Sequence, residues 1–270
     1  PYTAYVQITG RTGSKTGFHR ECGLQWKSGG NSSRAPDRIG ITRPLGQTDA
    51  MNDAADSALT SRIAELFPDG VTVSAGTTLP AAARLLPGEE ADTDAMVPHR
   101  LREYMLGRHC ARTALRNIGH EAVAIPRNAD RSPAWPEGIV GSISHSGDIA
   151  AAVVGHATDF AGLGLDIESP EPLSTDLAAM ICRDDEGRSG DNAKLLFGIK
   201  EAIYKCIYPT VGIYVDFKEM AVELNLAGSS FTAQPHSPNF EPATIAGLQG
   251  RFVKDEDYLI CAAWLPGRQD

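Results

Sequence analysis

The sequence lacks an excess of positive charge: its 25 lysines and arginines are outnumbered by 34 aspartates and glutamates, giving a formal net charge of -9. Proteins that bind nucleic acid generally carry a basic surface, so no nucleic-acid partner is expected. Long hydrophobic runs are also absent, since none reaches the roughly 18 apolar residues of a membrane-spanning helix. No basic segment followed by an apolar stretch opens the sequence, as it would in a signal peptide. These absences favour a cytoplasmic protein that works without a membrane.

The cysteines are few and scattered, and they form no pattern that binds zinc or builds a disulfide framework. Their odd number and wide spacing are typical of a reducing compartment. They are Cys22, Cys110, Cys182, Cys206 and Cys261.

Residues 1–50 differ in composition from the rest of the chain, with many Gly, Ser, Thr and Arg and few periodic apolar positions. The stretch Gly10–Thr16 is similar to a phosphate-binding loop, but two residues rather than four separate its glycines. We interpret residues 1–50 as an atypical N-terminal extension. A chain that starts at Met51 is expected to keep its fold and activity.

After residue 50 the hydrophobic pattern changes repeatedly between helical and strand periods, which predicts an α+β fold. Helices are expected over 98–118 and 193–208, the second ended by Pro209 because proline cannot continue a helix. Strand-like runs at 139–144 and 150–154 flank a turn-like tetrad, which predicts a β-hairpin with His145 at its tip. A third strand is expected over 163–167.

The third strand and the second helix carry acids beside lysines. Asp166 and Glu168 are two residues apart, so they point to the same face of a strand. Glu201 and Lys205 are four apart and are neighbours on a helix surface, with Lys200 just before them. Carboxylates are ligands of Mg²⁺, and ammonium groups bind phosphate oxygens. If the three acids gather in space, they predict a magnesium site beside a phosphate.

Basic residues line the first predicted helix. Arg108, Arg112 and Arg116 are each four apart and form one stripe, and Arg100 lies two turns before Arg108. The planar guanidinium group suits bidentate binding of phosphate. The alternative is structural: the stripe is a solvated helix face, and His145 is a hydrogen-bonded turn residue.

The acidic residues have a structural alternative as well. Asp166 and Glu168 would suit the exposed face of an edge strand. Glu201 and Lys205 would suit a solvent-facing ion pair, which contributes only a few tenths of a kcal/mol. The functional interpretation depends on their joint occurrence with the basic residues.

Four short segments occur in order along 98–209, and their residues belong to one kind of chemistry. They are GRHCAR at 107–112, Trp135-Pro136 ahead of GSISH at 141–145, GLDIE at 164–168 and FGIKEAIYK at 197–205. Together they resemble the 4′-phosphopantetheinyl transferases, most of all the monomeric type that serves siderophore, polyketide and nonribosomal peptide synthesis.

The resemblance implies a fold and a reaction. The fold has two similar subdomains, 51–160 and 161–270, related by a pseudo-twofold axis, each an antiparallel sheet packed on a long helix. In the reaction, coenzyme A gives its 4′-phosphopantetheine arm to a serine of an apo acyl or peptidyl carrier protein. Adenosine 3′,5′-bisphosphate leaves, and Mg²⁺ is required.

The resemblance also implies roles for individual residues. Asp166, Glu168 and Glu201 would bind Mg²⁺, while Glu201 and Lys205 would be catalytic. The serine proton would go either to Glu201 or to a metal-bound water. Coenzyme A would be bound by basic and hydroxyl side chains, namely Arg100, Arg108, Arg131, Ser144, His145, Lys200 and Lys205.

Two other classes of protein remain open. Another magnesium-dependent phosphoryl or nucleotidyl enzyme would explain the acids and lysines, but not the histidine near an arginine-rich helix. Preference for adenosine 3′,5′-bisphosphate over ATP would argue against it. A non-catalytic module that binds coenzyme A or a carrier protein is the second, and it should lose little on Asp166→Ala.

Overall fold

The computed structural model describes residues 45–267, except for 92, 122 and 238–239. The Gly10–Thr16 stretch and Cys22 therefore lie outside the described residues, as does nearly all of the predicted extension. Its last positions belong to helix α1, Leu45–Ala64, so the expected boundary at residue 50 falls inside a helix.

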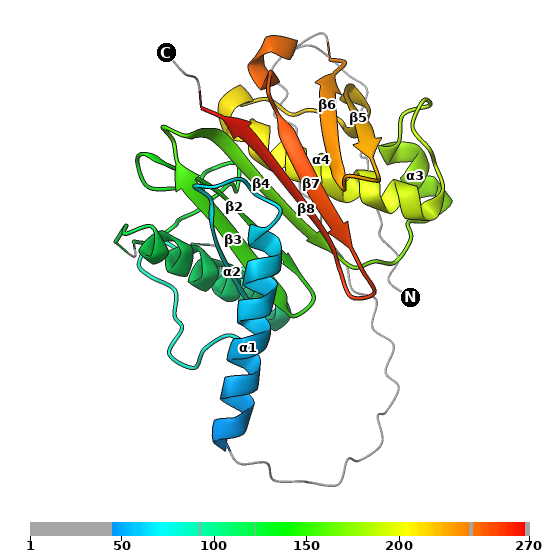
Figure 1. The fold of residues 1–270 in the computed structure, drawn as a ribbon. Helices are drawn as coiled ribbons and strands as arrows, with labels where there is room; N and C mark the ends of the chain where they lie inside the picture. The colour runs from blue at the N-terminus through cyan, green and yellow to red at the C-terminus, as the bar shows by residue number, and fades with distance from the viewer. Residues whose placement is uncertain (1–44, 92, 122, 238–239, 268–270) are drawn as a thin grey trace, which may run out of the picture. The chain divides into compact units, whose positions relative to one another are not determined.

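Two antiparallel sheets form the framework of the described residues (Figure 1). The first has the order β1-β3-β2 and consists of β1 (Thr72–Gly76), β2 (Ile139–Ser146) and β3 (Ile149–His156). The second has the order β4-β8-β7-β6-β5 and consists of β4 (Phe160–Glu168), β5 (Met220–Asn225), β6 (Ser230–Pro235), β7 (Gln249–Lys254) and β8 (Leu259–Pro266).

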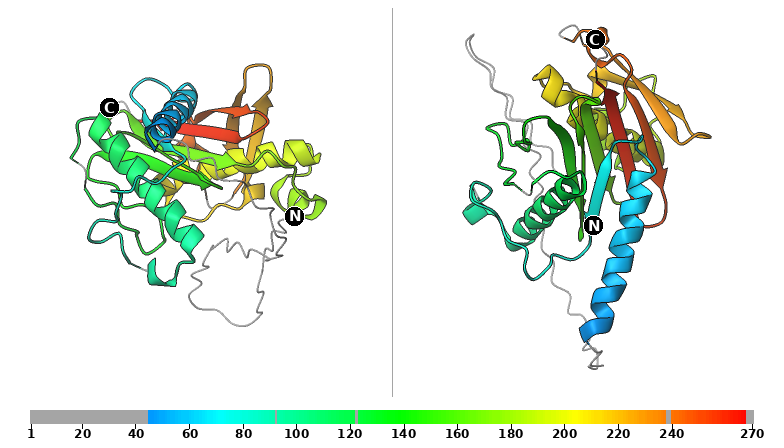
Figure 2. Two further views of the ribbon diagram at one scale, coloured as in Figure 1. Left: turned by 90° about the horizontal axis from the view of Figure 1, so that it is seen from below. Right: turned by 60° about the vertical axis from the view of Figure 1, so that its left-hand side comes forward.

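Each sheet packs against a long helix, and helix α1 also contacts β1 of the first sheet (Figure 2). Helix α2 (Pro98–Asn117) lies on the first sheet, and α4 (Gly190–Val211) lies on the second. The predicted α+β fold with two antiparallel sheets is confirmed. The division into two similar subdomains stays a prediction. The shorter helices are α3 (Thr175–Ile181), η1 (Thr93–Ala95), η2 (Phe217–Glu219) and η3 (Pro242–Ile245).

The side chains of β3 alternate between the two faces of the first sheet, and each face packs into a core. Ala150, Ala152 and Val154 join the core beneath α2. Ala151 and Val153 point the other way, into a core shared with α1 and the second sheet. The period-two alternation of a strand produces this division.

The β2–β3 hairpin is tighter than the sequence predicted. The strands pair up to Ser146 and Ile149, so only two residues form the turn, and the first of them, Gly147, has a φ of 58°. His145 therefore lies inside β2 opposite Ala150, and its predicted place at the tip was wrong. Two-residue hairpin turns favour glycine because they require positive φ.

Helix α4 also extends beyond its predicted ends. Ser189 caps its start by accepting a hydrogen bond from the backbone N–H of Asn192. Pro209 lies within the last turn and does not end the helix, because the chain closes that turn with Gly212 N–H donating to the Tyr208 carbonyl. Gly212 has a φ of 63°, the left-handed conformation usual after a helix.

The bulk expectations can be compared with the described residues. None of their helices is both long and apolar enough to cross a bilayer. The four cysteines among them, Cys110, Cys182, Cys206 and Cys261, are free and buried.

Candidate functional site

Helix α4 lies unusually close to one face of β4, and glycines make this possible. A Cβ added at Gly162 would come within 2.0 Å of the Cys206 carbonyl oxygen. One added at Gly164 would come within 1.9 Å of the Ala202 carbonyl oxygen. Since both clashes involve helix backbone, only glycine permits this approach.

The same row of β4 continues into the two acids. A Cβ at Gly198 would lie 3.7 Å from Asp166 Oδ2 and 3.1 Å from Cys261 Sγ, so this glycine lets α4 approach β4 and β8. Further along, Lys194 Nζ lies 2.7 Å from Glu168 Oε2. Two strand residues span about 6.6 Å and four helix residues about 6 Å, so strand and helix stay in step along the row. The glycines thus fix the depth at which the acids meet α4.

Asp166 is the buried centre of the acidic group. Its Oδ1 accepts a hydrogen bond of 2.6 Å from Lys205 Nζ and one of 3.4 Å from the Ser144 hydroxyl. Its Oδ2 is buried and has no hydrogen-bond partner among the described residues. Burial opposes the charge of Lys205, but the carboxylates of Asp166 and Glu201 outweigh it and raise the pKa of that ammonium group.

The charge of Asp166 affects the pKa values of Glu168 and Glu201. Burial and the charge of Asp166 raise the pKa of Glu168, against the attraction of Lys194. The same two causes raise the pKa of Glu201 to about 7, against the attraction of Lys205. Mutual repulsion of this kind is what a bound cation would relieve.

The side chains of the three predicted acids are not arranged as a metal site in this structure. Among the described residues, no group of three or more His, Cys, Asp or Glu side chains could hold a metal ion as it stands. The physical reason is that Lys205 and Lys194 hold Asp166 and Glu168 as ion pairs. The chemistry still fits Mg²⁺, because the donors are carboxylates and one buried oxygen of Asp166 has no partner within the described part of the chain.

Two serines of β2 join the first sheet to β4 where no strand pairing connects them. The Ser142 hydroxyl accepts the backbone N–H of Leu165 at 3.1 Å, and the Ser144 hydroxyl accepts that of Ile167 at 3.0 Å. These two N–H groups flank Asp166 along β4. Ser144 also receives Lys205 Nζ at 3.4 Å, so its buried hydroxyl belongs to the acidic group.

The next residue of β2, His145, points to the opposite side and meets α2. Its ring contacts Arg100, and its Nδ1 lies 3.5 Å from Glu103 Oε1. Arg100 donates to Glu103 Oε2 at 3.0 Å, and His99 Nε2 lies 3.1 Å from Oε1. The predicted basic pair of Arg100 and His145 is therefore brought together.

The other predicted basic residues are dispersed. Arg108 is buried, its guanidinium lies 4.5 Å from the centre of the Tyr104 ring, and its Nε has no partner among the described residues. Arg112 is buried too and binds Glu89, so the alternative of a solvated helix face is wrong at this position. Arg131 is exposed on the loop before β2 with a φ of 70°.

Lys200 is placed elsewhere, and the predicted phosphate contact is corrected. Its ammonium donates to Glu186 Oε2 at 2.6 Å and to the carbonyls of Ile181 and Phe217 at 3.1 and 2.9 Å. The lysine side chain is 1% exposed. One helix position turns a side chain by about 100°, which directs Lys200 toward α3 and η2 while Glu201 faces β4.

Sequence reasoning missed Glu103 and Lys194. Both pair across elements with residues that were predicted, Glu103 with His145 and Lys194 with Glu168. The only sequence signal was for Glu103, which lies three residues after Arg100 on one helix face.

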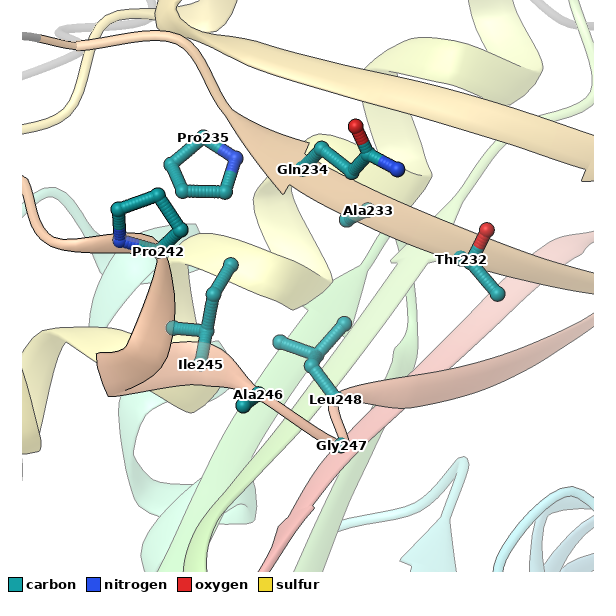
Figure 3. Close-up of a pocket in the computed structure, with 9 residues that line it drawn as sticks. All are labelled: Thr232, Ala233, Gln234, Pro235, Pro242, Ile245, Ala246, Gly247 and Leu248. Carbon is teal, nitrogen blue, oxygen red and sulfur yellow. The ribbon is translucent and has the colours of Figure 1, made fainter.

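A surface pocket lies at the far end of the second sheet, between β6 and η3 (Figure 3). None of the predicted site residues lines it. Its lining residues are Thr232, Ala233, Gln234, Pro235, Pro242, Ile245, Ala246, Gly247 and Leu248.

The sequence matches two family models, and together they cover both groups of site residues. Residues 88–155 match the 4′-phosphopantetheinyl transferase N-terminal domain, which includes Arg100, Glu103 and His145. Residues 162–263 match the 4′-phosphopantetheinyl transferase superfamily, which includes Asp166 and Glu201.

Three curated relatives have sequences similar to this one. The 4′-phosphopantetheinyl transferase Svp of Streptomyces mobaraensis is 33% identical over 215 residues, covering 74% of this chain and 87% of Svp. The 4′-phosphopantetheinyl transferase Npt of Nocardia iowensis is 31% identical, covering 62% of this chain and 79% of Npt. Enterobactin synthase component D of Salmonella typhimurium is 34% identical, covering 58% of this chain and 66% of the relative. The chain therefore belongs to the 4′-phosphopantetheinyl transferase family.

Proposed function

We propose that this protein transfers the 4′-phosphopantetheine arm of coenzyme A to a serine of an apo carrier protein, releasing adenosine 3′,5′-bisphosphate. The observation that carries the proposal is the position of Ser144 and His145. These adjacent β2 residues point to opposite sides, Ser144 to Asp166 and His145 to Arg100 and Glu103. A ligand with a diphosphate and a separate terminal phosphate, as coenzyme A has, would bind with the diphosphate at the acidic group and the terminal phosphate at Arg100 and His145.

The acidic group would serve the diphosphate. Asp166, Glu168 and Glu201 would hold Mg²⁺, which when bound neutralises charge on the phosphate oxygens. Metal binding would require the ion pairs of Lys205 with Asp166 and of Lys194 with Glu168 to break, so that carboxylate oxygens become available. Lys205 is only partly buried, and its ammonium would then move to the phosphate that is attacked.

The serine of the carrier protein would attack the phosphorus atom that bears the pantetheine arm. The new bond joins the serine oxygen to phosphorus, and the bond that breaks joins phosphorus to the oxygen bridging to the adenosine half. The bridging oxygen keeps the electron pair and leaves with adenosine 3′,5′-bisphosphate. The serine proton would go to Glu201 or to a water molecule at this site.

The partner would be an acyl or peptidyl carrier protein. The name of one relative, enterobactin synthase component D, favours a carrier of siderophore or nonribosomal peptide synthesis. Svp and Npt are named only as transferases, which is consistent with that choice.

The test is to incubate the protein with coenzyme A, Mg²⁺ and a panel of apo carrier proteins and to weigh the products. A carrier that gains the mass of one phosphopantetheine supports the proposal. Glu201→Gln and Lys205→Ala should each remove most of the activity while the fold is kept. Near-normal rates in either variant would contradict the assigned roles.

Two controls separate the rival classes. A nucleotidyl or phosphoryl enzyme should prefer ATP to adenosine 3′,5′-bisphosphate in a binding assay, whereas the proposed transferase should prefer the bisphosphate. If the protein is a non-catalytic module, the wild type should show no turnover, and Asp166→Ala should bind coenzyme A as well as the wild type does. Loss of turnover in Asp166→Ala with Mg²⁺ present favours the transferase.

A further inference from the structure

Glu103 is a carboxylate at the centre of three basic side chains. Arg100 donates to its Oε2 at 3.0 Å, and His99 and His145 approach its Oε1 at 3.1 and 3.5 Å. Its side chain is 9% exposed, while the three basic groups are more exposed than it is. The acid therefore lies beneath a layer of basic side chains that are more exposed than it is.

The contacts of Glu103 fix the directions of its partners. Arg100 spans from Glu103 to the ring of His145, so one guanidinium nitrogen touches both groups. Although burial opposes the charged form, hydrogen bonding and charge from His145, with help from Arg100 and His99, lower the pKa of Glu103 to about 2. Glu103 is thus ionised at neutral pH.

The position of Glu103 bears on how an anion would bind to the basic side chains around it. The acid holds Arg100 and His145 in place before the anion arrives, which reduces the loss of side-chain freedom on binding. Arginine carries a large rotamer entropy, so fixing it in advance matters more than for a short side chain.

We propose that Glu103 is a positioning residue for the terminal 3′-phosphate of coenzyme A, acting through Arg100 and His145. The inference rests on the proposed function and adds a residue that does not itself touch the substrate. Arg100 and His145 contact the phosphate, and Glu103 holds them from behind.

The experiment compares coenzyme A with 3′-dephospho-coenzyme A, which differs only in the terminal phosphate. Carrier-protein modification is followed for the wild type, Glu103→Gln and the control Glu223→Gln. The control makes the same chemical change at an exposed position of β5. We expect Glu103→Gln to raise KM for coenzyme A about 10-fold with kcat nearly unchanged, as loss of a charged hydrogen bond would. With the dephospho substrate Glu103→Gln and the wild type should be alike, and Glu223→Gln should resemble the wild type with both substrates.

A second variant guards against a general loss of structure. Glu103→Asp keeps the charge but shortens the side chain, so positioning predicts a raised KM for coenzyme A alone. Wild-type behaviour in Glu103→Asp together with a loss in Glu103→Gln would mean that charge, not position, matters, and would overturn the inference. So would an equal loss with both substrates, or a lower KM for coenzyme A in Glu103→Gln.

A binding measurement separates failure of the inference from failure of the proposed function. Calorimetry compares adenosine 3′,5′-bisphosphate with adenosine 5′-monophosphate for the wild type and Glu103→Gln. If no carrier protein is modified, the proposed function fails, but a preference for the bisphosphate that is lost in Glu103→Gln still supports the inference. Equal binding of both nucleotides by the wild type overturns it even if transfer occurs.

Discussion

Glu201→Gln should make the protein more stable in the absence of metal while removing its activity. Glu201 is a half-buried carboxylate that shares its surroundings with Asp166 and Glu168. Burial and these two negative charges raise its pKa from 4.5 to about 7, even though Lys205 attracts it. Glutamine keeps the shape of the side chain and removes the charge.

The sign and size of the effect follow from the raised pKa. A carboxyl group whose pKa is higher in the folded protein costs stability as pH rises from the unfolded value of 4.5 through about 7. At about 1.36 kcal/mol per pKa unit, the cost above pH 7 is on the order of 3 kcal/mol. For a domain of this size that corresponds to roughly 6–12 °C in Tm. Near pH 4 the variant and the wild type should be equally stable.

Thermal unfolding in EDTA at pH 4 to 8 measures this directly. The matched control is Glu223→Gln on the exposed side of β5, which should change stability by less than about 0.5 kcal/mol at every pH. Mg²⁺ should stabilise the wild type at pH 8 and have a smaller effect on Glu201→Gln, because binding relieves the repulsion. If Glu201→Gln unfolds at the same temperature as the wild type at pH 8, the argument from repulsion is refuted.

The remaining predictions concern Lys200 on α4 and Gly164 on β4. Lys200→Met should destabilise the protein by about 3–5 kcal/mol in chemical unfolding, because it leaves the buried Glu186 without its ion-pair partner. The kcat per folded molecule should stay near wild type, unlike that of a Lys205 variant. A selective loss of turnover would show that Lys200 takes part in the reaction. Gly164→Ala should abolish the native fold or shift β4 away from α4, since its Cβ would meet the Ala202 carbonyl oxygen. A circular dichroism melt that matches the wild type would contradict that account.

Much of the acidic group could be predicted because it depends on short-range geometry. Asp166 and Glu168 share a face through strand alternation, and Glu201 and Lys205 share one through helical spacing. Lys205 does lie against Asp166, at 2.6 Å. No spacing rule, however, indicated that Lys194 would bind Glu168 across two elements.

The wrong predictions for Lys200 and His145 also rested on short-range sequence patterns. Lys200 is adjacent to Glu201 in sequence, yet it binds Glu186 because α3 and the loop after it pack on that side of α4. His145 was expected at a hairpin tip, but the strands pair for two residues more than the apolar run indicated. Pairing satisfies backbone groups whatever their side chains, so hydrophobic pattern alone does not locate the end of a strand.

By itself the sequence determined which residues share a face of each strand and helix, because the chain's own periods of two and 3.6 residues fix that. The glycines at positions 162 and 164 permit a close approach to β4, but only the packed structure shows that α4 makes it. Only the tertiary structure decided which charge meets which, as with Glu103 beneath Arg100 and His145. The strength of an ion pair depends on distance and burial between elements, and those quantities exist only after the elements have packed.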